Sequence, residues 1–141
     1  MIDANVVLKL VLPWEGLSAA ATTVLCLPHE GSAGRWMTVD FLDVECANAL
    51  ASVARRGTID PSYARQSLEV IASLPLVRWR TTALLGEALE ISCTHGASVY
   101  DACYVALADV LGVPLVTADE KLVRRLGGTR HAVVHLAEFA A

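Results

Sequence analysis

Short apolar runs alternate along the chain with longer stretches whose apolar positions recur at helical spacing. The short runs predict strands at residues 1–5, 36–39, 76–80, 114–117 and 133–136. The longer stretches predict a helical turn ending at Pro13 and helices at residues 17–27, 42–56, 61–74, 82–94, 98–111 and 119–126. Strands that alternate with helices usually form a parallel sheet covered on both faces. We therefore expect an α/β fold, a three-layer α/β/α domain with a mostly parallel central sheet of about four to five strands.

Signals at the ends of the predicted helices support these boundaries. Asp60 followed by Pro61 is typical of a helix start, with the Asp side chain as cap and Pro at the first helical position. Gly57, Gly96 and Gly112 each follow a predicted helix, where glycine readily adopts the left-handed conformation that ends it.

The size of the chain indicates one domain spanning residues 1–141, since its mass is 15.0 kDa. Hydrophobic residues make up 55% of it and the mean hydropathy is +0.49, which is high for a soluble protein. We expect both a large core and an apolar surface that a partner covers.

Charged, Gly or Pro residues interrupt every apolar run before the roughly 18 residues that a membrane span needs. The N-terminus also lacks the basic segment and cleavage site of a secretion signal, because Asp3 stands where basic residues are expected. A cytoplasmic protein without a membrane span is expected.

The four cysteines, Cys26, Cys46, Cys93 and Cys103, form no C-x-x-C pair and have no histidine at zinc-ligand spacing. They lie in apolar or helix-like runs, so we expect four buried, reduced thiols.

The formal net charge of −4 argues against non-specific binding to nucleic acid, which depends on neutralising phosphates. A cation bound by carboxylates would reverse the sign locally. Arg55–Arg56, Arg78–Arg80 and the Lys121–Arg125 segment could each supply a basic edge, although such clusters are commonly solvated helix faces.

Several acidic residues follow predicted strands or begin predicted helices. Asp3 and Asp119 come at the carboxyl ends of two strands, where open parallel sheets bind ligands. Ser98 and Asp101 have the spacing of a helix capping box, and Thr117 to Glu120 repeats that pattern. Asp101, Asp119 and Glu120 could therefore serve only as helix caps.

Glu45 lies within a helix so apolar that little of it can face water. A carboxylate beside such a helix must be protonated, paired with an arginine or placed at a cation. Four neighbouring carboxylates, from Asp3, Glu45, Asp101 and Asp119, would repel one another unless a cation neutralised them. Mg²⁺ or Mn²⁺ is the economical explanation, because Mg²⁺ binds oxygen ligands and keeps waters that can act as nucleophiles.

Four segments together resemble the four acidic motifs of PIN domains, and of bacterial VapC-type toxins in particular, in their order and spacing. They are IDANVVLK at residues 2–9, DVECANAL at 43–50, YDACYVALA at 100–108 and LVTAD at 115–119. The resemblance covers essentially the whole chain. It implies a PIN-type fold and an endoribonuclease that acts on structured RNA, is neutralised by a cognate VapB-type antitoxin and is commonly a homodimer.

The resemblance also implies a role for each site residue. Asp3 and Asp101 would be the chief metal ligands, Asp119 would complete the site, and Glu45 would hold a metal-coordinated water or accept a proton. Thr117 matches the family's hydroxyl residue beside the last acid, which orients the cluster.

This chain departs from the family in two places. Asn5 stands where the family often has Ser or Thr, and its amide can still hydrogen-bond a carboxylate or water. The family's first strand usually begins a few residues before the position of Met1, which leaves open a native start upstream.

Two other functions are open. Asp3-Ala4-Asn5-Val6 faintly resembles the motif of haloacid-dehalogenase-type phosphatases, but Asn5 cannot be their second acid. The acidic pocket could instead capture an arginine of a partner without catalysis.

The excess of apolar residues further predicts a dimer and a groove near the first helices that binds an amphipathic partner segment. Trp14, Leu17 and Val24 are the candidate contacts, with ordinary core packing as the alternative for each.

Overall fold

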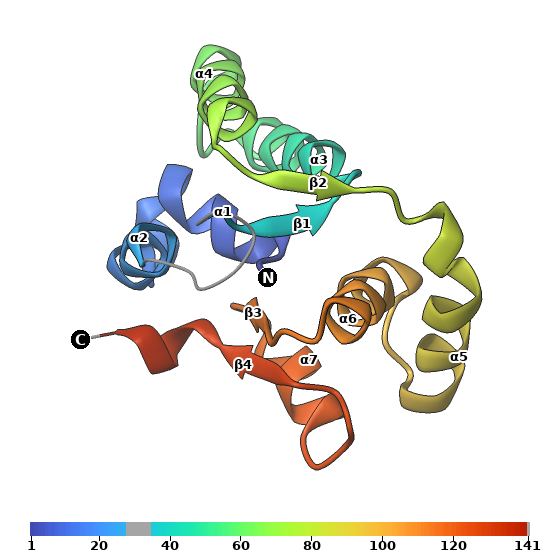
Figure 1. Cartoon of the computed structure of the whole chain (residues 1–141). Coiled ribbons are helices and arrows are strands. Elements are labelled where there is room, and N and C mark those ends of the chain that lie inside the picture. Colours follow the sequence, from blue (N-terminus) through green and yellow to red (C-terminus); the bar gives the residue numbers. More distant parts are fainter. Residues whose placement is uncertain (28–34, 141) are drawn as a thin grey trace.

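The computed structural model describes residues 1–27 and 35–140. Four strands alternate with helices along the chain (Figure 1). The strands are β1 (Met37–Val39), β2 (Val77–Trp79), β3 (Leu115–Thr117) and β4 (Val133–His135). The α-helices are α1 (Ala4–Val11), α2 (Ser18–Cys26), α3 (Leu42–Arg55), α4 (Pro61–Ser73), α5 (Leu85–His95), α6 (Val99–Leu111) and α7 (Glu120–Leu126). Short 3₁₀ helices are η1 (Pro13–Glu15), η3 (Thr82–Leu84) and η4 (Leu136–Phe139).

The strands form one parallel arrangement with the N-terminal residues at its centre. β1 pairs with β2 and β3 pairs with β4, in both cases in parallel. Ile2 joins the two pairs, because its N–H donates to the Met37 carbonyl at 3.1 Å and it forms a parallel bridge with Val116. The spatial order is therefore β2, β1, residues 1–3, β3 and β4. The predicted α/β class is confirmed.

Helices cover this sheet on both faces. From residues 1–3 the chain first adds β1 and β2 on one side, and it then returns to add β3 and β4 on the other side. Parallel crossovers are almost always right-handed, so the two directions place their helices on opposite faces. Figure 1 shows α1 to α4 on one side of the sheet and α5 to α7 on the other. None of the helices described here is both long and apolar enough to cross a membrane.

The predicted strand over residues 1–5 extended too far, because Ala4 and Asn5 belong to a helix. Helix α1 begins at Ala4, because the Asp3 carboxylate accepts a hydrogen bond from the Val6 N–H at 3.0 Å and caps the helix. The predicted cap of α7 was also misplaced. Thr117 belongs to β3, and Asp119 caps α7 by accepting from two backbone N–H groups.

Other predicted boundaries are confirmed. Asp60 accepts from the Tyr63 N–H at 2.8 Å at the start of α4, and Ser98 accepts from the Asp101 N–H at 3.0 Å at the start of α6. Gly96 and Gly112 end α5 and α6 with φ angles of 69° and 65°. These are left-handed angles that glycine adopts without strain.

The core is a single cluster of aliphatic side chains shared by the sheet and its helices. Cys46 and Cys103 are buried in it. The prediction that all four cysteines are buried was wrong, because Cys26 and Cys93 are exposed near the C-terminal ends of α2 and α5. All four are free thiols.

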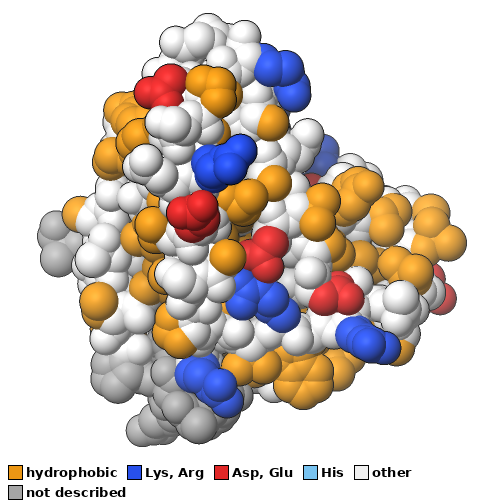
Figure 2. Space-filling model, turned by 90° about the horizontal axis from the view of Figure 1, so that it is seen from above, with side chains coloured by type: hydrophobic (Ala, Val, Ile, Leu, Met, Phe, Trp, Pro, Cys, Tyr) orange, Lys and Arg blue, Asp and Glu red, His pale blue; other side chains and the backbone are white. Residues whose placement is uncertain are grey.

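Some large apolar side chains remain on the surface, including Trp14, Val44, Leu89, Tyr100 and Val110. On the face seen in Figure 2, hydrophobic side chains lie between basic and acidic ones, and neither charge forms a continuous patch. Val24 is fully buried, so its predicted role as a partner contact was wrong, because α2 packs this side chain into the core.

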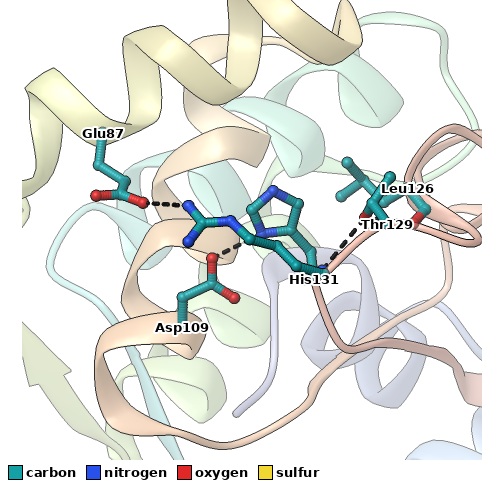
Figure 3. Close-up of polar contacts among 6 residues, drawn as sticks. Glu87, Asp109, Leu126, Thr129 and His131 are labelled. Atoms are coloured by element: carbon teal, nitrogen blue, oxygen red, sulfur yellow. Dashed lines mark hydrogen bonds and ion pairs between the residues drawn. The ribbon is translucent and has the colours of Figure 1, made fainter.

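An exposed ion pair and a buried contact between a histidine and a carboxylate hold the segment before β4 against α5 and α6 (Figure 3). His131 Nδ1 lies 2.6 Å from Asp109 Oδ2, and only 3% of the His131 side chain is exposed. Arg130 Nη2 lies 2.7 Å from Glu87 Oε1, but 72% of the Arg130 side chain is exposed. Exposed ion pairs contribute little to stability because water screens their charges. Removing the partner of a buried histidine costs more, because a ring nitrogen is left without a hydrogen bond and away from water.

We therefore expect Asp109→Ala to lower the free energy of unfolding by about 1–3 kcal/mol, and Glu87→Ala by less than about 1 kcal/mol. Urea unfolding of both variants and the wild type measures the difference. Equal losses in the two variants would contradict this ranking.

Candidate functional site

Three of the four predicted acids line one cavity at the carboxyl edge of the sheet. Asp3 follows the central extended residues, Glu45 lies in the first turns of α3, and Asp101 lies in the first turn of α6. The cavity has a volume of about 200 Å³ and is also lined by Asn5, Ala4, Leu8, Asn48, Ala49 and Tyr104. Edges of this kind, where the strand order reverses, are the usual ligand sites of parallel α/β sheets.

Asp3 is the most buried acid of the cavity, with 3% of its surface exposed. Burial raises the pKa of its carboxyl to about 7, and the nearby charge of Asp101 adds to that rise. Hydrogen bonds from the Thr117 hydroxyl, the Val6 N–H and the Asn5 amide oppose it. Asn5 donates from Nδ2 to Asp3 Oδ2 at 3.4 Å, so its amide contacts the carboxylate as its position predicts.

Glu45 is held by a tyrosine of the facing helix. The Tyr104 hydroxyl donates to Glu45 Oε2 at 2.5 Å. Burial raises the pKa of Glu45, the Tyr104 hydrogen bond lowers it, and the charge of Asp101 raises it. The alternative of a salt bridge to arginine is not realised within the described residues, where Arg78 instead pairs with Asp43 through contacts of 2.7 and 2.9 Å.

Asp101 is less buried than Asp3 and is fixed by its own helix cap. The Ser98 hydroxyl donates to Asp101 Oδ2 at 2.7 Å and accepts from the Asp101 N–H at 3.0 Å. One carboxylate oxygen is thereby engaged within the first turn of α6. The same side chain lines the cavity, so capping and a role in the site are compatible.

Asp119 lies outside the lining of this cavity. Its Oδ1 accepts from the Lys121 and Leu122 N–H groups at 2.8 and 3.2 Å, which caps α7. It is linked to the cavity through Thr117, whose hydroxyl accepts from the Asp119 N–H at 3.0 Å and donates to Asp3. Thr117 thus connects the two acids that follow neighbouring strands.

Tyr104 is a site residue that the sequence predictions missed. It stands three residues after Asp101 on α6, a spacing that places two side chains on one face of a helix. Asn48 stands in the same relation to Glu45 on α3. Burial raises the pKa of the Tyr104 hydroxyl, so it remains a hydrogen-bond donor to Glu45.

The possible metal ligands in the cavity are carboxylate and amide oxygens, the ligand type that Mg²⁺ and Mn²⁺ prefer. No three His, Cys, Asp or Glu side chains within residues 1–27 and 35–140 are close enough together to hold a metal jointly. Mg²⁺ usually binds one or two carboxylates and retains water for its other positions. Asp3 and Asp101 would supply these two carboxylates, and a cation between them would offset the burial and repulsion that raise the pKa of Asp3.

Comparisons with known proteins give the family. Residues 1–127 match the model of the PIN domain. The chain is 32% identical over 127 residues to "Ribonuclease VapC3" of Pyrobaculum aerophilum, a match that covers 89% of this chain and 92% of that protein. It is 31% identical over 116 residues to "Ribonuclease VapC12" of Mycobacterium tuberculosis, with coverage of 78% and 88%.

A solved structure has the same fold. The crystal structure of PAE2754 from Pyrobaculum aerophilum aligns with a TM-score of 0.64, at 22% identity, over 99% of this chain and 94% of that one. The family match does not support the phosphatase alternative. The chain belongs to the PIN-domain family and is a relative of the VapC-type ribonucleases.

Proposed function

We propose that this protein is a Mg²⁺- or Mn²⁺-dependent endoribonuclease that hydrolyses phosphodiester bonds of structured RNA, and that it is the toxin of a VapBC-type toxin–antitoxin pair. The observation that carries the proposal is the convergence of Asp3, Glu45 and Asp101 on one cavity. The ribonuclease names of its relatives support RNA as the substrate class.

Asp3 and Asp101 would hold the cation, because both line the cavity and the charge of Asp101 acts on Asp3. Asp119 would complete the site indirectly, through a water or through Thr117, since its carboxylate caps α7 and lies outside the cavity lining. When bound, a divalent cation neutralises charge on the phosphate and increases the acidity of water.

Glu45 is the proposed proton acceptor for the attacking water. Its raised pKa makes it a stronger base than an exposed glutamate, and Tyr104 fixes the direction of one of its oxygens. The second carboxylate oxygen is then left to accept the proton as the water oxygen attacks phosphorus. The P–O bond to the departing ribose oxygen breaks, and that oxygen takes a proton from solvent. The amides of Asn5 and Asn48 can orient that water or a phosphate oxygen.

The acidic character of the chain is compatible with RNA as substrate, because a bound cation reverses the charge locally. Arg78 forms an ion pair with Asp43 and is therefore a poor candidate for phosphate binding. The exposed side chains of Arg80, Lys121 and Arg124 are better candidates for a basic rim. Lys121 lies in the first turn of α7, two residues after Asp119.

We expect purified protein with Mn²⁺ to cleave structured RNA, and both Asp3→Asn and Asp101→Asn to reduce the rate by about 100-fold or more, since each removes a proposed metal ligand. The matched control Glu69→Gln removes an exposed acid of α4 and should leave the rate unchanged. Gel-based cleavage assays with and without EDTA measure these rates.

If the wild type cleaves no RNA with Mn²⁺, and both Asn variants bind the cation as well as the wild type does, the nuclease proposal fails. The alternative is then a binding module that captures an arginine of its partner in the acidic cavity.

We further propose a cytoplasmic homodimer that binds a VapB-type antitoxin through the apolar surface beside the first helices. Trp14 is 52% exposed and rests against Tyr63, with ring centroids 5.9 Å apart. The Tyr63 hydroxyl donates to the Val11 carbonyl at 2.8 Å, which fixes that ring. Leu17 is half-buried beside them and is the second candidate contact.

Trp14→Ala should weaken binding of the cognate antitoxin by about 30-fold or more, because tryptophans are frequent binding hot spots at protein interfaces. The control Leu89→Ala removes an exposed apolar side chain of α5. Calorimetric titration with purified antitoxin measures both, and light scattering measures the oligomeric state. Equal affinity of the two variants for the antitoxin would exclude the surface around Trp14 as its binding site.

A further inference from the structure

A second cavity adjoins the acidic one and has a different character. Its volume is about 290 Å³, and its lining comprises Phe41, Val44, Glu45, Asn48 and Tyr100. Glu45 and Asn48 line both cavities, so the two adjoin at these side chains. We call this second cavity the aromatic pocket.

The aromatic pocket exposes apolar surface that the fold does not need for its core. Tyr100 is 64% exposed and Val44 is 69% exposed. The two side chains come from α6 and α3, at the mouth of a site that otherwise presents acids and amides. Exposed aromatic surface beside a polar site commonly marks a ligand contact.

The aromatic rings are fixed in a row that ends at Glu45. Phe41 stands edge-on to Tyr100 and to Tyr104, with ring centroids 5.7 Å apart in both cases and interplanar angles of 79° and 76°. Tyr104 in turn donates to Glu45. Tyr100 is therefore held by its neighbour while much of its ring remains open to solvent.

We propose that the aromatic pocket binds an unpaired nucleobase next to the phosphate that is cleaved, stacked on Tyr100 with its edge hydrogen-bonded to Asn48. This inference rests on the proposed function. Aromatic side chains bind unpaired bases by stacking, and an asparagine amide offers both a donor and an acceptor to a base edge.

The shared lining of the two adjoining cavities favours a nucleotide over a protein segment as occupant. In RNA the base and the phosphate belong to one chain. A phosphate bound through the cation of Asp3 and Asp101 would therefore bring a neighbouring base within reach of the adjoining pocket. A base-paired nucleotide cannot offer its face for stacking. Cleavage should therefore fall in loops or bulges of the structured RNA rather than in its stems.

The experiment uses a hairpin RNA with the cleavage site in its loop and a set of copies with one abasic nucleotide at successive loop positions. The wild type should lose about 5- to 150-fold in cleavage rate at one position, the range expected for one stacked base. Tyr100→Ala should lose a similar factor on the intact RNA and should no longer distinguish the abasic copies. Tyr100→Phe keeps the ring and should retain most of the rate.

The control Val110→Ala removes an exposed apolar side chain at the other end of α6 and should behave as the wild type. A second readout uses Asp101→Asn, whose slow cleavage leaves the RNA intact during the measurement, with 2-aminopurine at the sensitive loop position. Its fluorescence should fall on binding, because stacking quenches it, and should not fall when Tyr100→Ala is added.

If the wild type cleaves the intact hairpin, but Tyr100→Ala does so equally well and no abasic position matters, the pocket inference fails and the nuclease proposal stands. If Tyr100→Ala instead disrupts the dimer or antitoxin binding and cleaves the hairpin at the wild-type rate, the pocket is a protein contact and the inference is overturned. If the wild type cleaves no RNA at all, both proposals fail together.

Discussion

The burial of the Asp3 carboxylate is the constraint on which the site depends. Asp3 follows the central extended residues of the sheet and must also cap α1, so its side chain cannot turn away to water. The chain supplies it with N–H and O–H donors from Val6, Asn5 and Thr117, which favour the ionised form, yet burial still raises its pKa to about 7. A cation that binds there would remove this cost, which links the stability of the fold to the proposed activity.

The neighbouring elements extend this arrangement from one carboxylate to a working site. Thr117 ties Asp3 to the turn at which α7 begins, so the two halves of the sheet are joined at the cavity. Helix α6 contributes Asp101 and Tyr104 from one face, and Tyr104 fixes Glu45 across the gap to α3. Each acid is thus oriented by a neutral hydroxyl or amide, which leaves its charge available to a cation or a proton.

The sequence was sufficient to predict the α/β class, most helix ends and the acids at the cavity, because strand ends and caps depend on local patterns. Contacts across the fold were not predictable in this way. Tyr104 bonds Glu45 from another helix, and nothing near Glu45 in the sequence indicates it. The exposed position of Cys26 and the burial of Val24 likewise depend on which face of α2 meets the core. The strand at residues 1–5 was overpredicted because apolar residues continue into α1.

The most direct test is the free energy of unfolding of the cation-free wild type and Asp3→Asn between pH 4 and pH 8.5. The folded pKa of Asp3, about 7, lies above its unfolded value, so the wild type should lose roughly 1–3 kcal/mol relative to the variant as pH rises from about 4 to 7. Asparagine still caps α1, and other titrating groups are common to both proteins. Mg²⁺ at pH 8 should restore stability to the wild type alone. Parallel pH curves, or equal stabilisation of both proteins by Mg²⁺, would contradict the account.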